Sequence, residues 1–333
     1  MLTVCILEVL NDHASKENKI FQEDILEYLE KDHDTSITRK TLSSYLPILA
    51  DYGYIYYKKN KNGIYKINKF SDEDLRILID SIMYSKHIPQ NKVNNLISKL
   101  KELSPVGLKG KMENVRYINS IYRTKNTGLY EVLDEIDRAI EKNKQVEITR
   151  CRYNVKGELE DFITETIHPY YIVASNSRYY VICYAERDNK LESRRIDRIS
   201  KAITLDGKGN ENRNKNRKPL SEILNINSHF DLGKYMREHV YMFSGKSVQI
   251  KIKMKKNHIS YFVDSFGDDF RARNIEGEDD YVEITTKNNE NATYYWALQY
   301  GELAEILEPK NLRDRFRQGL ENILKKYQNK DKG

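Results

Sequence analysis

Three arginines in one short segment, which also holds an aspartate, could bind an anion. Arg194, Arg195, Asp197 and Arg198 fall within five positions of the stretch RYYVICYAERDNKLESRRIDRIS, residues 178–200. Guanidinium groups bind phosphate through paired hydrogen bonds and stack on nucleic-acid bases. If the segment is a strand, alternation pairs Arg195 with Asp197 and leaves Arg194 and Arg198 to project together. The residues therefore predict a cationic cleft for phosphate.

The same arginines permit a second interpretation. Glu186, Asp188 and Glu192 lie in the same stretch, and their carboxylates could neutralise the arginines along a solvated sheet edge. Composition alone favours neither alternative.

Other reactive residues do not indicate catalysis. Cys5, Cys151 and Cys183 are single, with no CxxC pair, and the histidines lack metal-ligand spacing. We therefore expect free thiols and no metal or cofactor, with Cys183 in the core. The acidic clusters 267–269 and 278–280 fall at predicted turns, where carboxylates are common, so we expect no enzyme.

Charge and length limit the class of protein. The chain has 333 residues, a net charge of +6 and 25 tyrosines, which fits a multidomain protein with an anionic partner. Runs of apolar residues are too short for a membrane span, and MLTVCILEVL lacks the basic start of a signal peptide. We expect a cytoplasmic protein that does not bind membranes.

Residues 1–70 are predicted to form a winged helix-turn-helix. Helical spacing gives three apolar stripes, followed by a hairpin that turns at Asn62-Gly63. The stripes are Val4, Leu7 and Leu10; Phe21, Ile25 and Leu29; and Leu42, Leu46 and Leu49.

The third helix and the hairpin supply the candidate duplex-DNA contacts. A recognition helix presents its early turns to base edges, while wing lysines suit phosphates. The candidates are Thr38, Arg39, Lys40, Ser43, Ser44, Lys58, Lys59 and Lys61. An ordinary solvated helix and hairpin is the alternative.

Residues 71–127 are predicted to be a helical connector that dimerises. Ser71 is a suitable N-cap, and Leu75, Leu78, Ile79 and Ile82 form an apolar stripe. This segment has too little core to fold alone, so we expect it to pack against a second subunit.

The rest of the chain completes an α+β multidomain protein. Residues 128–206 read as a helix followed by short strands, which predicts a small β-barrel. Residues 207–246 are a linker and helix. Residues 247–333 follow the ferredoxin-like order β-α-β-β-α-β, with Val248, Ile250, Ile252 and Met254 facing the core. Trp296 is predicted to be a core residue.

These segments together resemble the WYL-domain transcription regulators of bacteria. Tyr179-Tyr180-Val181 stands where the family has its Trp-Tyr-Leu triplet, and RIDRI, residues 195–199, matches the family ending. ATYYWALQYGELAEILEPKNLRDRF resembles the WYL C-terminal extension, and TRKTLSSYL is similar to the family's DNA-binding domain. The resemblance covers nearly the whole chain.

The resemblance implies a ligand sensor. WYL domains adopt an SH3-like or Sm-like barrel whose basic cleft is thought to bind nucleic acid or nucleotide. Carried over by position, the cleft residues are Tyr153, His168, Tyr180, Arg195 and Arg198, with Arg194 and Arg150 as weaker additions. Without the resemblance, His168 before Pro169 would be a structural residue.

The predicted function is ligand-responsive transcription regulation. We expect a homodimer that binds an operator duplex and responds to single-stranded nucleic acid, such as single-stranded DNA, or to a nucleotide. The alternative is a nucleic-acid-binding accessory protein, or an enzyme, in repair or phage defence.

Overall fold

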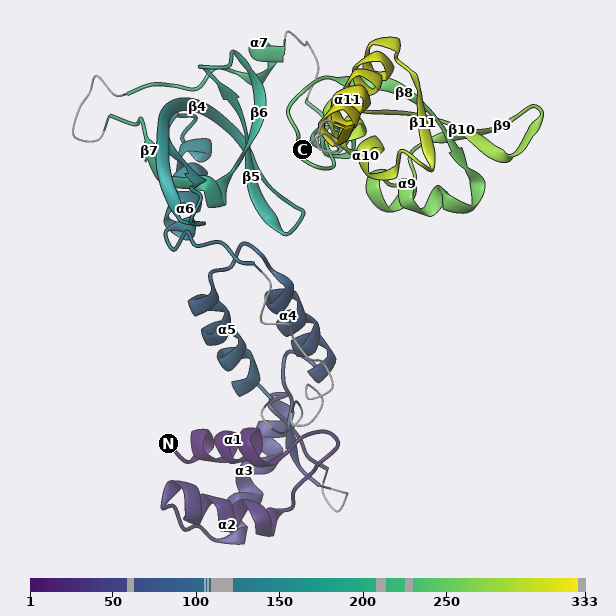
Figure 1. Ribbon diagram of the computed structural model, residues 1–333. Helices are drawn as coiled ribbons and strands as arrows, with labels where there is room; N and C mark the ends of the chain where they lie inside the picture. The colour runs from purple at the N-terminus through teal and green to yellow at the C-terminus, as the bar shows by residue number, and fades with distance from the viewer. Residues whose placement is uncertain are drawn as a thin grey trace. The chain divides into compact units, whose positions relative to one another are not determined.

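N-terminal helices followed by antiparallel sheets make up the computed structural model (Figure 1). It describes residues 1–58, 63–104, 106, 108, 122–207, 214–224 and 230–328. The chain divides into two units, Met1–Lys125 and Asn126–Gly333. The predicted mixed α and β class is confirmed. None of the helices in the described ranges is long and apolar enough to cross a membrane.

Three helices and a two-stranded hairpin begin the first unit. They are α1 (Leu2–His13), α2 (Gln22–His33), α3 (Arg39–Asp51), β1 (Ile55–Tyr56) and β2 (Tyr65–Lys66). The predicted stripe Leu42, Leu46 and Leu49 is buried, as expected. Val4 and Phe21 were predicted to face the core, but both are exposed. The buried face of α1 contains Ile6 and Val9 instead of Val4. Phe21 is the N-cap residue that precedes α2.

A helical pair completes the first unit. Its members are α4 (Asp72–Tyr84) and α5 (Gln90–Glu102). Ser71 caps α4, as predicted: its Oγ accepts the Asp74 N–H at 3.1 Å, and the Asp74 carboxylate accepts the Ser71 N–H at 3.0 Å. Leu75 and Ile79 are buried, whereas Leu78, predicted in the same stripe, is 38% exposed.

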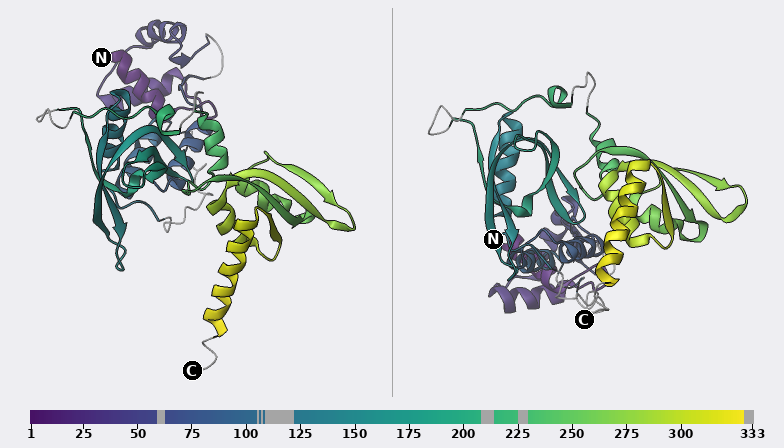
Figure 2. Two further views of the ribbon diagram at one scale, coloured as in Figure 1. Left: turned by 90° about the horizontal axis from the view of Figure 1, so that it is seen from above. Right: turned by 45° about the horizontal axis from the view of Figure 1, so that its top comes forward.

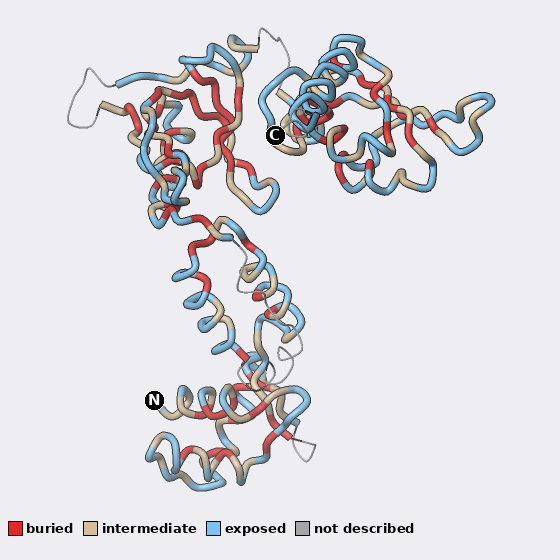
Figure 3. The backbone as a smooth tube through the Cα atoms, viewed as in Figure 1, coloured by how far each residue is buried: buried red, intermediate tan, exposed pale blue. Residues whose placement is uncertain are grey.

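A five-stranded antiparallel sheet, packed on one helix, begins the second unit. The helix is α6 (Leu129–Glu141), and the strands are β3 (Val146–Tyr153), β4 (Leu159–Ser175), β5 (Arg178–Ala185), β6 (Lys190–Arg195) and β7 (Ile199–Thr204). Their order is β6-β5-β4-β3-β7. Along β5, Val181 and Cys183 pack in the α6 core, while Tyr180 and Ile182 join a second cluster. Both faces of β5 are therefore buried, and Figure 3 shows buried residues along these strands.

Two short helices, α7 (Leu220–Leu224) and α8 (Leu232–Glu238), precede a four-stranded sheet. Its elements are β8 (Ser247–Lys255), α9 (Ile259–Phe266), β9 (Arg271–Ile275), β10 (Glu278–Asn289), α10 (Glu290–Tyr300), β11 (Ala304–Glu308) and α11 (Lys310–Gln328). The strand order is β11-β8-β10-β9, and α11 extends well beyond the sheet (Figure 2).

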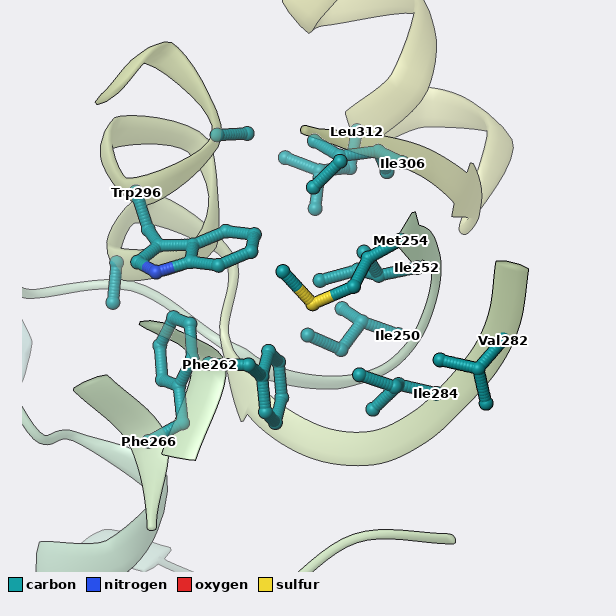
Figure 4. Packing of buried hydrophobic residues seen from close by; sticks show 13 residues of the cluster. Ile250, Ile252, Met254, Phe262, Phe266, Val282, Ile284, Trp296, Ile306 and Leu312 are labelled. Carbon is teal, nitrogen blue, oxygen red and sulfur yellow. The ribbon is translucent and has the colours of Figure 1, made fainter. Parts of the chain in front are cut away.

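The core of this second sheet forms as the sequence predicted. Ile250, Ile252 and Met254 are fully buried, and Trp296, only 2% exposed, packs edge-on against Phe262 (Figure 4). The indole N–H of Trp296 donates to Ser265 Oγ at 3.1 Å, so the polar end of the ring is also satisfied.

Two substitutions in α3 test the placement of its buried face. Leu46→Ala should lower the free energy of unfolding of the first unit by about 2–5 kcal/mol, because Leu46 is fully buried. Ile48→Ala should change it by less than about 0.5 kcal/mol, because Ile48 is 54% exposed. Hydrogen exchange of the α1–α3 amides in the full chain measures both effects, and equal acceleration by the two variants would contradict this packing.

Candidate anion-binding site

A cavity of about 590 Å³ lies between strands β3–β6 and the segment that precedes β8. Its walls are rich in arginine and aromatic side chains. They are formed by Arg150, Cys151, Arg152, Phe162, Tyr180, Ser193, Arg194, Arg195, Arg198, Tyr241, Met242 and Phe243. The structure thus brings together five of the predicted cleft residues, namely Arg150, Tyr180, Arg194, Arg195 and Arg198.

A buried carboxylate orients one wall of the cavity. Asp197 is 1% exposed and accepts hydrogen bonds from Arg178 Nη1 at 2.7 Å and from Arg195 Nε and Nη2 at 3.0 and 2.8 Å. The predicted pair of Arg195 with Asp197 is confirmed. Because one carboxylate faces two guanidinium groups, the cluster keeps a net positive charge.

The continuous strand considered for the arginine segment is interrupted. Residues 196–198 form a 3₁₀ turn, η1, between β6 and β7. The turn is needed because β6 pairs with β5 at one edge of the sheet and β7 pairs with β3 at the other. The strict alternation that placed Arg194 beside Arg198 therefore does not apply.

Arg194 is neutralised rather than available to a ligand. It is 9% exposed, and each of its three nitrogens bonds a carboxylate: Nε to Glu165 at 3.1 Å, Nη1 to Glu192 and Nη2 to Asp188. Burial alone would lower the pKa of Arg194, but Glu165 and Glu192 outweigh it and raise that pKa. The prediction that Arg194 projects as a free cation is therefore corrected.

Arg198 differs from the other wall arginines. Arg150 pairs with Glu165 at 3.1 Å and Arg152 with Glu160 at 3.0 Å, whereas Arg198 has no carboxylate within 4.0 Å among the described residues. Its guanidinium lies 4.7 Å from the centre of the Tyr153 ring. Its Nε is buried without a hydrogen-bond acceptor in the described part of the chain. An anion in the cavity would meet an uncompensated charge here.

Tyr180 and the segment 240–243 close the apolar side. Burial raises the pKa of Tyr180, so its hydroxyl stays protonated at neutral pH. Met242 has a left-handed backbone, φ 53°, and its carbonyl accepts the Ser193 hydroxyl at 2.8 Å. The sequence analysis missed this wall, although the apolar triplet Tyr241-Met242-Phe243 within the predicted linker was a usable signal.

His168 is a structural residue, which corrects its assignment to the cleft. Its side chain is fully buried and does not line the cavity. Nδ1 accepts the Lys218 N–H at 2.8 Å, which leaves the proton on Nε2 to donate to Glu186 at 3.0 Å. Both ring nitrogens are therefore occupied. Tyr153 does not line the cavity, and its ring contacts the guanidinium of Arg198.

Cys183 of β5 is buried in the core between the sheet and α6, as predicted. Its side chain is 0% exposed, and burial raises the pKa of the thiol to about 12. A neutral, inaccessible thiol is a poor nucleophile.

Comparison with protein families identifies both parts of the second unit. Residues 131–204 match the WYL domain and residues 246–324 match the WCX domain. The chain is a WYL-domain protein. The WYL match contains the arginine wall, Tyr153 and Tyr180, whereas Tyr241–Phe243 lie between the two matched domains. The resemblance noted from the RIDRI segment is confirmed.

Solved structures align with this WYL-domain protein over most of its length. The proteasome accessory factor B/C (PafBC) of Arthrobacter aurescens is 13% identical, over 97% of this chain and 48% of that chain, with a TM-score of 0.29. A CRISPR Cas-related protein is 15% identical, over 99% and 85%, with a TM-score of 0.38. The chain spans about half the length of the PafBC chain. Curated protein sequences gave no match.

The candidate DNA contacts of the WYL-domain protein lie mostly on the surface of α3. Thr38 is the N-cap of α3, and Arg39 pairs with Glu23 at 3.3 Å on an exposed surface. Lys40 and Ser44 are exposed. Ser43 is less available, because its hydroxyl donates to Gln22 of α2 at 3.1 Å.

Lys19 lies beside the hairpin and is a further candidate DNA contact that the sequence did not indicate. Lys19 Nζ lies 5.3 Å from the Tyr56 ring centre and 5.8 Å from that of Tyr65. The bridge between Ile20 and Ile64 places it there, and such a long-range pairing is not visible in local sequence. Lys58 lies near Tyr56, 5.8 Å from the ring centre. Lys59, Lys61 and the predicted turn residue Asn62 fall outside the described residues.

The dependence of the arginine wall on Asp197 can be tested with matched carboxylate-to-amide changes. Asp197→Asn should cost about 3–5 kcal/mol of folding free energy, because it leaves two partly buried guanidinium groups without their counter-charge. Glu160→Gln breaks an exposed pair with Arg152 and should cost less than about 1 kcal/mol. Hydrogen exchange of the β5 and β6 amides measures the difference, and equal costs would refute the buried role of Asp197.

Proposed function

We propose that this chain is a DNA-binding transcription regulator whose WYL domain senses single-stranded nucleic acid or a nucleotide. The single observation that carries the proposal is Arg198, the wall arginine without a carboxylate partner among the described residues. It borders a cavity of about 590 Å³, a size suited to a small ligand or to part of an extended chain.

The surroundings of Arg198 favour nucleic acid over a simple anion. Tyr153, Tyr180 and Phe162 supply aromatic surface beside the arginines. Stacking of one base on an aromatic ring is worth about 1–3 kcal/mol and tolerates any base. A cation with neighbouring aromatic rings therefore supports phosphate and base contacts in the same cavity.

The folds proposed for the three regions agree with these roles. The order α1-α2-α3-β1-β2 supports a winged helix-turn-helix with α3 as the recognition helix. Pairing of the first and last strands, β3 with β7, supports an SH3-like or Sm-like barrel. The strand order β11-β8-β10-β9 supports a ferredoxin-like domain.

Regulation requires no catalysis in this scheme. A ligand that binds one arrangement of a dimer more tightly shifts the population of arrangements and so alters operator affinity. We expect the protein not to be an enzyme: Asp268, Asp269, Asp279 and Asp280, the carboxylates nearest to a metal-site pattern, are all exposed.

The helical connector is the proposed homodimer contact. On α4, Ile77 and Tyr84 lie two turns apart and are 64% and 59% exposed. Leu96 of α5 and Leu103, the C-cap residue of that helix, have the same spacing and are 36% and 42% exposed. Apolar stripes at this spacing are typical of helices that pack on a partner.

Fluorescence polarisation with the full chain tests the sensor. The probe is a labelled single strand of about eight nucleotides, a length typical of single-strand sites. Arg198→Ala should weaken its binding about tenfold or more, because a charge-assisted phosphate contact is lost. The salt slope should fall by about 0.7.

Matched variants separate the cavity from general charge effects. Arg187→Ala removes an exposed arginine outside the cavity and should leave single-strand binding unchanged. Lys40→Ala should weaken binding of a mixed-sequence duplex but not of the single strand. If Arg195→Ala and Arg198→Ala both bind every single-stranded probe as the unchanged chain does, the proposed sensor site is wrong.

Light scattering of the full chain tests the dimer. Ile77→Glu should raise the dimer dissociation constant about tenfold or more, because it places a charge in an apolar contact. Lys101→Gln makes the same change in net charge on an exposed position of α5 and should not alter the mass. A chain that is monomeric before any substitution would exclude this interface.

A further inference from the structure

A second cavity, of about 640 Å³, lies at the edge of the four-stranded sheet. Strand β9 begins at Arg271, which pairs with Thr285, so residues 286–289 of β10 extend beyond it. Helix α8 and the residues before β9 border this uncovered end of β10. The cavity shares no wall residue with the arginine cavity of the WYL domain.

The second cavity carries an excess of positive charge. Two of its cations are balanced: Lys287 pairs with Glu238 at 3.1 Å, and Arg237 lies 3.9 Å from Asp269. Lys234 and Arg271 also line the cavity, and neither has a carboxylate within 4.0 Å among the described residues. Two uncompensated cations on opposite borders, α8 and β9, favour a ligand with negative charge.

A buried amide independently indicates a ligand. Asn288 is 2% exposed and lines the cavity, and its Nδ2 has no acceptor among the residues described. A buried amide without a hydrogen-bond partner is costly, so native proteins rarely retain one. A bound molecule with a carbonyl or ring-nitrogen acceptor would satisfy this donor once the Asn288 amide turns toward the cavity.

Apolar surface at the same cavity narrows the ligand class. Phe266 and Phe270 both line it. Phosphate would meet Lys234 and Arg271, a planar ring would contact Phe270, and an acceptor on that ring would meet Asn288. We propose that this cavity binds a nucleoside 5′-monophosphate, at a site separate from the WYL cavity.

Calorimetry on the full chain tests this site with defined probes. AMP, GMP, CMP and UMP are titrated one at a time, with inorganic phosphate and the four nucleosides as partial ligands. At least one monophosphate should bind saturably, and about tenfold more tightly than either of its parts, because two kinds of contact act together. No saturable binding by any of the four would overturn the proposal, and so would equal binding of inorganic phosphate.

Paired variants locate the binding. Arg271→Ala should weaken the monophosphate about tenfold. Arg273→Ala removes the same charge two residues along β9, outside the cavity, and should have no effect. Asn288→Leu keeps the buried volume but removes the donor, so it should weaken binding without loss of folding.

The WYL cavity serves as the internal control. Any monophosphate that binds the WYL cavity should be lost in Arg198→Ala, so binding that persists in Arg198→Ala and is weakened by Arg271→Ala belongs to the second cavity. Loss of binding in Arg198→Ala, with none in Arg271→Ala, would assign the nucleotide to the WYL cavity and overturn this second site. Because the two cavities share no wall residue, failure of the single-strand sensor would leave this result intact.

Discussion

Buried carboxylates hold the arginine wall together, and the cavity depends on them. Asp197 joins β5 to the turn after β6 through Arg178 and Arg195. Glu165 of β4 joins β3 to β6 in the same way, through Arg150 and Arg194. Buried charge is tolerated only when it is paired and hydrogen-bonded, so these carboxylates allow many arginines to lie close together around one cavity. Arg198 has no such carboxylate partner among the described residues, so its guanidinium remains for a ligand.

The repeating parts of the fold could be predicted from sequence. Alternation along β8 placed Ile250 and Ile252 correctly, because a strand with one buried face directs every second side chain into the core. Cys183 was placed by the continuous apolar run of β5, which is typical of a strand buried on both faces. The α3 stripe and the Ser71 cap were equally local signals. In α1 the predicted stripe contained Val4, whereas the buried face contains Ile6 and Val9. This helix has apolar residues on most sides, so its sequence does not determine which side faces the core.

The site was predicted in outline but not in its charge balance. Arg194 and Glu165 are 29 residues apart, so their pairing depends on the register of strands that the sequence does not specify. The 3₁₀ turn at residues 196–198 broke the alternation from which side-chain directions were inferred. His168 was assigned through resemblance alone, and its buried bond to Lys218 depends on a segment 50 residues away.

Besides the packing of its side chains, the segment from Val240 to Ser244 is held by hydrogen bonds to its own carbonyl oxygens. The carbonyls of Val240 and Met242 accept bonds from Asn176 and Ser193 of the WYL domain. Those of Phe243 and Ser244 accept bonds from Asn289 and Asn291. Main-chain acceptors are the same for every amino acid. A change of the side chains at 241 and 243 would therefore leave these main-chain hydrogen bonds in place while altering the surface that the cavity presents to a ligand.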